Sequence, residues 1–303
     1  MEDAYVDQVR SFNRTVTERV GVLNDDFLGR GRALGEARVL WEIGRGDGEV
    51  RALRKRLHLD SGYMSRVLRA LERDGLVTIG PGEHDGRVRT ARLTAKGRSE
   101  RDVLDRRSDA LAESLLDPLD DRQRGQLVAA MADVERLLTA ALVVIVPVDP
   151  LHRDAVRCLR AYFAELAERF DSGFDESQSR TYALDEVRPP NGIVLMAYLD
   201  DRAIGCGSLK GSGKHPPEIK RLWVDSDARG LGVGRRLLGA LEAHAALAGA
   251  RSVRLDTNAA LTEAIALYRA TGYVEVSPFN NETYAHHWFS KRLAKRQVGY
   301  KDK

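Results

Sequence analysis

The sequence predicts two domains, a mainly α domain followed by an α/β domain, and three observations support this prediction. The 303 residues exceed the ~250–300 at which a single hydrophobic core usually stops growing. Apolar residues from Ala33 to Leu138 follow a mostly helical period. After Leu142, strand-like and helix-like segments alternate. We therefore predict domains over residues 1–141 and 142–295, with a basic tail over residues 296–303.

The composition favours a globular cytoplasmic protein. Hydrophobic residues make up 43% and charged residues 31% of the chain. The longest apolar run, residues 141–148, is shorter than the ~20 residues that span a membrane, and the first ten residues contain no apolar signal region. Cys158 and Cys206 form neither a CxxC pair nor a disulfide framework, so we expect reduced core thiols.

Apolar spacing predicts the elements of the first domain. The expected helices are 4–22, 34–44, 49–57, 61–74, 94–116 and 121–140, and the expected strands are 76–79 and 88–93. Residues 51–107 hold 15 Lys and Arg against 8 Asp and Glu, a net charge of +7, although residues 1–146 hold 25 of each kind. This local excess predicts a basic surface that binds a polyanion.

The segment 61–74 is predicted to be the recognition helix of a helix-turn-helix. Its apolar residues share the face that must pack inward, and they are Met64, Val67, Leu68 and Leu71. Ser61 is expected to cap the helix and Gly75 to end it. The candidate DNA contacts are Ser61, Gly62, Tyr63, Ser65, Arg66 and Arg69, with Arg87 and Arg89 on a hairpin that turns at Asp85-Gly86. A solvated arginine face is the alternative interpretation.

The stretch ALRKRLHLDSGYMSRVLRALERDGLV, followed by DGRVRTARLTAKG, resembles the winged helix-turn-helix of the MarR family of transcriptional regulators over roughly residues 1–140. The resemblance implies a homodimer that binds palindromic double-stranded DNA and is joined through helices 4–22 and 121–140. An apolar stripe suits such an interface and consists of Leu127, Met131, Val134, Leu137 and Leu138. The same stripe could instead pack within one chain.

In the second domain, strands are expected at 142–148, 193–199, 203–209, 218–225, 252–257, 273–276 and 285–292, and helices at 151–169, 232–248 and 260–271. The stretch RGLGVGRR, residues 229–236, therefore lies at a strand-to-helix turn, where backbone N–H groups and the helix dipole favour a phosphate. It matches neither a Walker loop nor a dinucleotide fingerprint.

The spacing R-x-x-G-x-G resembles motif A of the GNAT family of N-acetyltransferases, as do the stretches LDTNAALTEAIALYRATGYVEV and VPVDPLHRDAVRCLRAYFAEL; together they cover about residues 143–293. The resemblance implies a mixed sheet flanked by helices, with acetyl-CoA (coenzyme A) as acyl donor between strands 218–225 and 252–257. The cofactor-binding residues it implies are Leu222, Trp223, Val224, Arg229, Gly230, Leu231, Gly232, Val233, Gly234, Arg235, Asn258 and Tyr268.

The expected chemistry is direct attack by an amine on the thioester, which needs a base and an acid. Glu218 is the candidate base, acting through water, or alternatively a surface carboxylate. Tyr268 matches the residue that protonates the departing thiolate, or alternatively is a packing residue. Asn280, Asn281 and Tyr284 are candidate acceptor contacts. We expect no metal site, because the adjacent histidines 286 and 287 point to opposite faces of a strand.

These features together predict a bifunctional transcriptional regulator and acetyl-CoA-dependent N-acetyltransferase. The expected acceptor is a primary amine of a small molecule, an amino acid or a peptide. Two other classes stay open: a DNA-binding regulator whose second domain senses acetyl-CoA, and one whose second domain is a non-catalytic interaction module.

Overall fold

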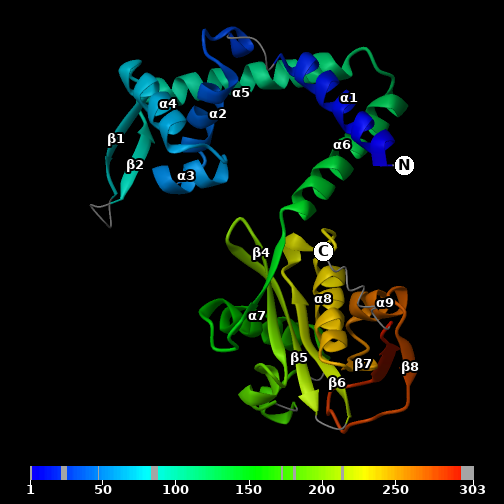
Figure 1. Ribbon diagram of the computed structural model, residues 1–303. Coiled ribbons are helices and arrows are strands. Elements are labelled where there is room, and N and C mark those ends of the chain that lie inside the picture. Colours follow the sequence, from blue (N-terminus) through cyan, green and yellow to red (C-terminus); the bar gives the residue numbers. More distant parts are fainter. Residues whose placement is uncertain are drawn as a thin grey trace, which may run out of the picture. The chain divides into compact units, whose positions relative to one another are not determined.

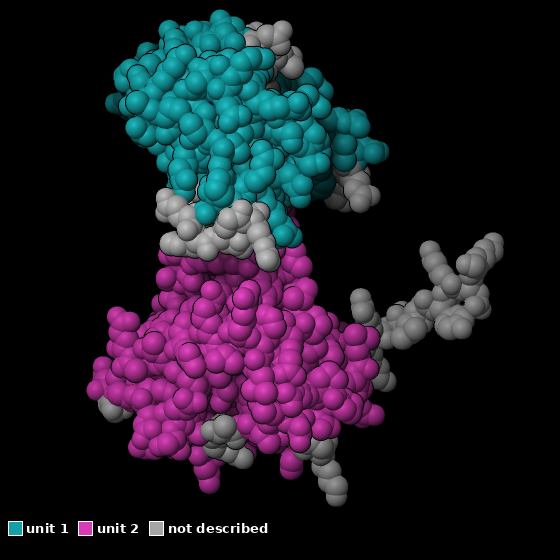
Figure 2. All heavy atoms as spheres, turned by 90° about the vertical axis from the view of Figure 1, so that its left-hand side faces the viewer, with its two compact units in different colours: residues 1–129 teal, residues 130–303 magenta. Residues whose placement is uncertain are grey.

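The computed structural model describes residues 2–21, 26–46, 48–82, 88–171, 173–179, 182–212 and 215–294. Two compact units, residues 1–129 and 130–303, make up the chain (Figure 2). The division falls inside helix α6 (Asp121–Ala141), earlier than the predicted boundary at 141/142, because the helix belongs in part to each unit. The predicted basic tail lies outside the described residues. None of the helices in the described ranges has the length and apolarity to cross a bilayer.

The first unit is helical with one two-stranded antiparallel hairpin (Figure 1). Its elements are α1 (Glu2–Val20), η1 (Phe27–Gly29), α2 (Leu34–Ile43), α3 (Val50–Arg56), α4 (Ser61–Arg73), β1 (Val77–Pro81), β2 (Arg89–Leu93), α5 (Ala95–Leu116) and the beginning of α6. They confirm the predicted helices and strands to within three residues at their ends. The tip of the hairpin, with the predicted Asp85-Gly86 turn, lies outside the described residues.

Helix α4 packs its apolar face into the core of this unit. The four predicted inward residues, Met64 to Leu71, are each at most 3% exposed. The cap of this helix is one residue earlier than predicted: the side chain of Asp60 accepts from the Tyr63 N–H at 2.9 Å, whereas Ser61 is already helical. Gly75 ends the helix with a φ of 72°, a left-handed conformation that favours glycine.

The second unit is built on a seven-stranded mixed sheet in the order β3-β4-β5-β6-β7-β9-β8 (Figure 1). Its strands are β3 (Val144–Val148), β4 (Ile193–Leu199), β5 (Arg202–Ser212), β6 (His215–Val224), β7 (Ser252–Thr257), β8 (Val274–Val276) and β9 (His287–Arg292). Its complete helices are α7 (Arg153–Arg169), η2 (Glu176–Gln178), η3 (Leu184–Val187), η4 (Ser226–Ala228), α8 (Val233–Leu247) and α9 (Thr262–Ala270).

Both faces of the sheet are covered, as the continuous apolar run of β4 requires. Alternate residues of β4, from Ile193 to Ala197, join α8 in the larger core, whereas Val194 and Met196 join α7 in the smaller one. Cys158 and Cys206 are buried free thiols in the smaller core, which confirms that prediction.

Strands β6 and β7 are the one parallel pair in the sheet order, and they separate soon after they meet. Only Glu218 and Arg254 are registered as partners between them. Beyond that pair, a bulge at Arg221 bends β6, and Trp223 and Val224 are registered with β5 and not with β7. The edge of β6 that faces β7 therefore has free backbone groups along a widening gap, which agrees with the cleft expected from the sequence.

Candidate functional site

The glycine-rich turn joins η4 to α8 and forms one wall of a cleft of about 470 Å³. Gly230 and Gly232 have φ values of 83° and 72°, and a Cβ on either would meet no atom within 4 Å. Both glycines are thus needed for backbone conformation and not for space. Gly232 is the N-cap of α8, so the first amides of this helix point into solvent at its positive end. This arrangement suits a phosphate.

The side chain of Arg229 fixes this turn and does not extend into the cleft as a free cation. Its guanidinium binds the Glu165 carboxylate at 2.6 Å and donates to the Val224 carbonyl oxygen at 3.2 Å. Glu165 also accepts from the indole of Trp223 at 2.8 Å. Burial opposes ionisation of Glu165, but hydrogen bonds from Arg229, Trp223 and Arg169 hold its pKa below the usual value.

Most of the predicted cofactor-binding residues come together around this cleft. The residues that line it include Leu222, Trp223, Val224, Arg229, Gly230, Gly232, Val233, Gly234 and Arg235. Leu231 instead packs its side chain against the larger core. Asn258 lines the adjoining cavity, where its carboxamide donates to the Tyr284 carbonyl oxygen and accepts from the Ala260 N–H, both at 2.8 Å. A cofactor contact for Asn258 stays a prediction.

A second, smaller cavity of about 90 Å³ adjoins the cleft, and the two share Tyr162, Leu166, Leu222, Leu261 and Ala264. Tyr268 lines the smaller cavity and is 6% exposed, with its ring beside those of Tyr273 and Phe289. Burial, with the nearby Asp256 carboxylate, raises the pKa of the Tyr268 phenol. The phenol therefore keeps its proton at neutral pH, as a general acid must.

Tyr162 is a site residue that the sequence reasoning missed. It lies on α7 at the border of the two cavities. Burial raises the pKa of its phenol, and the negative charge of Asp256 raises it further. A tyrosine in the middle of an amphipathic helix carries no local signal of such a role, because only the packing of α7 on the sheet brings it to the cavity.

A row of four alternating charges runs across β6 and β7. Arg254 binds Glu218 at 2.7 Å, Glu218 lies 3.6 Å from Lys220, and Lys220 binds Asp256 at 2.5 Å. Asp256 also accepts from the Asn280 amide at 2.9 Å. Lys220 and Asp256 line the small cavity beside Tyr268, whereas Glu218 and Arg254 line a different one.

The predicted roles of Glu218 and Asn281 are therefore corrected. Glu218 is buried between two cations and does not share a cavity with Tyr268, so it is neither a surface carboxylate nor placed to receive a proton from an amine there. Asn281 is exposed and outside the lining of the small cavity. Asp256 and Glu282 are carboxylates that do line it, and Asp256 stands two residues after Arg254 on the polar face of β7. That alternation was the available sequence signal.

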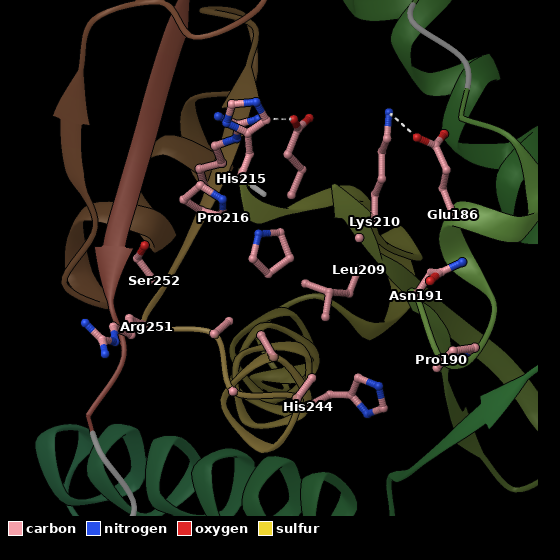
Figure 3. Close-up of a pocket in the computed structure, with 18 of the residues that line it drawn as sticks. Glu186, Pro190, Asn191, Leu209, Lys210, His215, Pro216, His244, Arg251 and Ser252 are labelled. Carbon is pink, nitrogen blue, oxygen red and sulfur yellow. Dashed lines mark hydrogen bonds and ion pairs between the residues drawn. The ribbon is translucent and has the colours of Figure 1, made fainter. Parts of the chain in front are cut away.

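The cavity that Glu218 lines is larger, about 1000 Å³ (Figure 3). Figure 3 shows Lys210 paired with Glu186 on one side, at 3.2 Å, and His215 on the other. His244 of α8 lies at its base. Because the glycine-rich turn at the start of α8 lines the cleft of about 470 Å³ instead, we do not assign the acetyl transfer to this cavity.

The other two acceptor candidates have different positions. Tyr284 lines the small cavity, and its hydroxyl accepts from the Asp175 N–H at 2.8 Å. Asn280 is not among the lining residues of the small cavity, but its side-chain amide donates a hydrogen bond to the Asp256 carboxylate. His286 and His287 have separate partners, Ala259 and Glu275, and the described residues contain no group of three or more potential metal ligands.

The outer face of α4 carries the predicted DNA contacts, with one exception. Ser61, Gly62, Ser65, Arg66 and Arg69 are exposed, as is Arg89 on β2. Tyr63 is half-buried against the core of the first unit, and its hydroxyl lies 2.0 Å from where a Cβ on Gly35 would be. Tyr63 therefore also packs in the core of this unit, and a DNA contact for it stays a prediction. Arg87 lies outside the described residues.

Comparisons with known proteins match the two parts of the chain in which these residues lie. An acetyltransferase (GNAT) family model matches residues 159–273, and a MarR family model matches residues 29–88. The chain carries a MarR-family region followed by a GNAT acetyltransferase domain. Both resemblances predicted from the sequence are thereby confirmed.

Two curated relatives match part of the chain. The IAA acetyltransferase of Azospirillum brasilense is 35% identical over 101 residues, 32% of this chain and 63% of the relative. An uncharacterized N-acetyltransferase of Schizosaccharomyces pombe is 33% identical over 93 residues, 30% of this chain and 57% of the relative. The chain thus spans 57% to 63% of the length of these relatives.

Two solved structures are also similar to parts of the chain. A GNAT-family acetyltransferase of Staphylococcus aureus is 16% identical, with 50% of this chain and 99% of that chain covered and a TM-score of 0.43. Streptococcus pneumoniae FabT, solved in complex with DNA, is 23% identical, with 45% of this chain and 94% of that chain covered and a TM-score of 0.36.

Proposed function

We propose that the chain is a bifunctional protein: its second unit is an acetyl-CoA-dependent N-acetyltransferase, and its first unit binds double-stranded DNA as a homodimer. The observation that carries the enzymatic part is the gap between β6 and β7, closed at one end by two left-handed glycines at the start of α8. The free amides at the edge of β6 can pair with the amide-bearing arm of acetyl-CoA. The N-terminus of α8 can bind its diphosphate. Both ligands, DNA and acetyl-CoA, favour a cytoplasmic location.

The residues of the cleft can support the transfer without a covalent intermediate. The free edge of β6 from Leu222 to Val224 provides amides that orient the donor and polarise its thioester carbonyl. The small cavity then holds the primary amine next to this edge, which makes the attack effectively intramolecular. Tyr268, whose raised pKa keeps it protonated, donates to the departing sulfur. Asp256 attracts the amine and helps to orient it.

The DNA-binding part rests on the exposed arginines of α4 and on the hairpin next to it. Arg66 and Arg69 extend from the outer face, where neither has a carboxylate partner in the described part of the chain. An exposed guanidinium at such a position is the side chain that reads guanine in the major groove. Arg89 lies on β2, where it would contact phosphates.

The homodimer rests on apolar side chains that one chain leaves uncovered. Tyr5 of α1 is 68% exposed, and Leu138 of α6 is 65% exposed, with Met131 at 52%. None of the described residues of α6 is buried. Surfaces of this kind mark protein contacts, and a second copy of the chain offers the same two helices. Sedimentation of the full chain should therefore give the mass of a dimer.

Titration calorimetry with acetyl-CoA and with CoA, combined with thiol release across a panel of primary amines, tests the enzymatic proposal. We expect binding of both ligands and thiol release with at least one amine. Binding without release would favour a sensor of acetyl-CoA. No heat and no shift in melting temperature with either ligand would overturn the proposal.

A further inference from the structure

Arg221 occupies the most unusual backbone position in the wall of the small cavity. Strand β6 has one more residue than β5 between the pairs Cys206↔Trp223 and Ser208↔Lys220, and Arg221 lies in this bulge with a φ of 53°. Such a conformation is unfavourable for a residue other than glycine and is frequent at ligand sites. The Cys206 thiol donates to the Arg221 carbonyl oxygen at 3.6 Å and helps to hold the bulge.

The guanidinium of Arg221 is held between two aromatic rings of the same cavity. Its central carbon lies 4.1 Å from the ring centre of Tyr182 and 5.2 Å from that of Phe163. Both rings line the cavity together with Arg221 itself. Stacking fixes the plane of the guanidinium but leaves its N–H groups at the edge available for hydrogen bonds.

Three other cations around the cleft each bind a carboxylate, and Arg221 differs from them in the described part of the chain. Lys220 binds Asp256 at 2.5 Å, Arg169 binds Glu263 at 2.7 Å, and Arg229 binds Glu165 at 2.6 Å. For Arg221, no carboxylate within the described ranges lies within 4.0 Å of a guanidinium nitrogen. A positioned guanidinium of this kind is suited to bind a carboxylate through two parallel hydrogen bonds.

Aromatic rings form a large part of the remaining wall of the cavity, and the polar side chains there include Lys220, Asp256, Asn258 and Glu282. Its walls include the rings of Phe170, Phe174 and Tyr284, which contact one another at centroid distances of 4.9–6.0 Å. Its volume of about 90 Å³ is roughly three times that of one water molecule, which suits part of a small molecule and not a polypeptide segment.

We propose that the acetyl acceptor is a free amino acid with an apolar side chain, and that Arg221 binds its carboxylate. This inference rests on the proposed acetyltransferase function. The amine nitrogen forms a bond to the acetyl carbonyl carbon, and the carbon–sulfur bond of the thioester breaks. The products are the N-acetyl amino acid and the CoA thiol, whose proton comes from Tyr268, while the amine loses one proton to Tyr268 or solvent. Arg221 is thus a specificity-determining residue in the wall of the cavity.

The test compares acceptors that differ only in the carboxylate. Thiol release from acetyl-CoA is measured with the twenty standard amino acids and, for the best of them, with its amide and its decarboxylated amine. We expect kcat/KM for the amino acid to exceed that for both analogues by roughly 10- to 150-fold, the range expected for a hydrogen bond to a charged group. Equal values for all three would overturn the inference.

Variants of Arg221 separate recognition from folding. R221Q should lower kcat/KM for the amino acid far more than kcat/KM for the decarboxylated amine, so that the preference for the carboxylate is lost. R221G should lose the same preference and yet melt no lower than R221Q, because glycine adopts a φ of 53° without strain. R153Q, at a side chain on α7 that is 90% exposed, is the matched control and should behave like the wild type.

Two outcomes distinguish a failure of this inference from a failure of the proposed function. If amines without a carboxylate are acetylated and amino acids are not, or if R221Q keeps the wild-type preference, the carboxylate site is wrong and the acetyltransferase stands. If no amine of either kind releases thiol and calorimetry detects no CoA binding, both are wrong.

Discussion

Replacing Gly232 with alanine tests whether the turn before α8 depends on its left-handed backbone. Gly232 has a φ of 72°, and a Cβ there would meet no atom within 4 Å, so the cost of G232A is conformational and not steric. A left-handed conformation costs an L-residue about 1–2 kcal/mol. If the turn keeps its shape, the second unit, residues 130–303, should melt roughly 2–8 °C lower. If the turn relaxes, the first N–H groups of α8 no longer point toward the phosphate site, and CoA should bind roughly 5- to 30-fold more weakly.

The assays are calorimetric melting and titration with CoA, and Gly239 in the same helix provides the matched control. Gly239 is exposed on α8, and a Cβ there would also meet no atom within 4 Å. G239A should therefore raise stability by about 0.5–1 kcal/mol, as alanine does in a helix interior, and leave CoA affinity unchanged. A G232A protein with the melting temperature and the CoA affinity of the wild type would refute the reasoning.

Three further predictions concern the acid, the DNA surface and the core of the first unit. Y268F should lower kcat by roughly 10²-fold or more without changing KM for acetyl-CoA, and an unchanged kcat would remove the acid role. DNA affinity, measured by fluorescence anisotropy, should fall steeply as the salt concentration rises, and an affinity independent of salt would contradict DNA binding by this surface. R66A should relax the sequence preference, whereas R89A should weaken binding to all sequences. G97A should lower the free energy of unfolding of the first unit by about 1–3 kcal/mol or more, because the new Cβ would lie 1.9 Å from the Leu76 carbonyl oxygen. A denaturant titration that gives the wild-type free energy of unfolding would contradict this packing.

Local periodicity was enough to predict the elements of both units and one part of the site. The inward face of α4 follows from helical spacing alone, because side chains at such spacing share one face whatever packs against it. The glycine turn was likewise predictable, since a strand, closely spaced glycines and an amphipathic helix place amides at a helix N-terminus irrespective of the rest of the chain. Tyr268 could be assigned from the family resemblance.

Only the tertiary structure decided which side chains meet across elements. Tyr63 lies on the predicted outer face of α4 but packs inward, because Gly35 on another helix leaves room for its hydroxyl. Because of the register of β6 against β7, Glu218 lines one cavity and Asp256 another. From residue type alone, either carboxylate could have been the base. The bulge at Arg221 and the contribution of Tyr162 from α7 depend in the same way on strand pairing and helix docking. Those contacts join residues far apart in the chain, so no local pattern in the sequence encodes them.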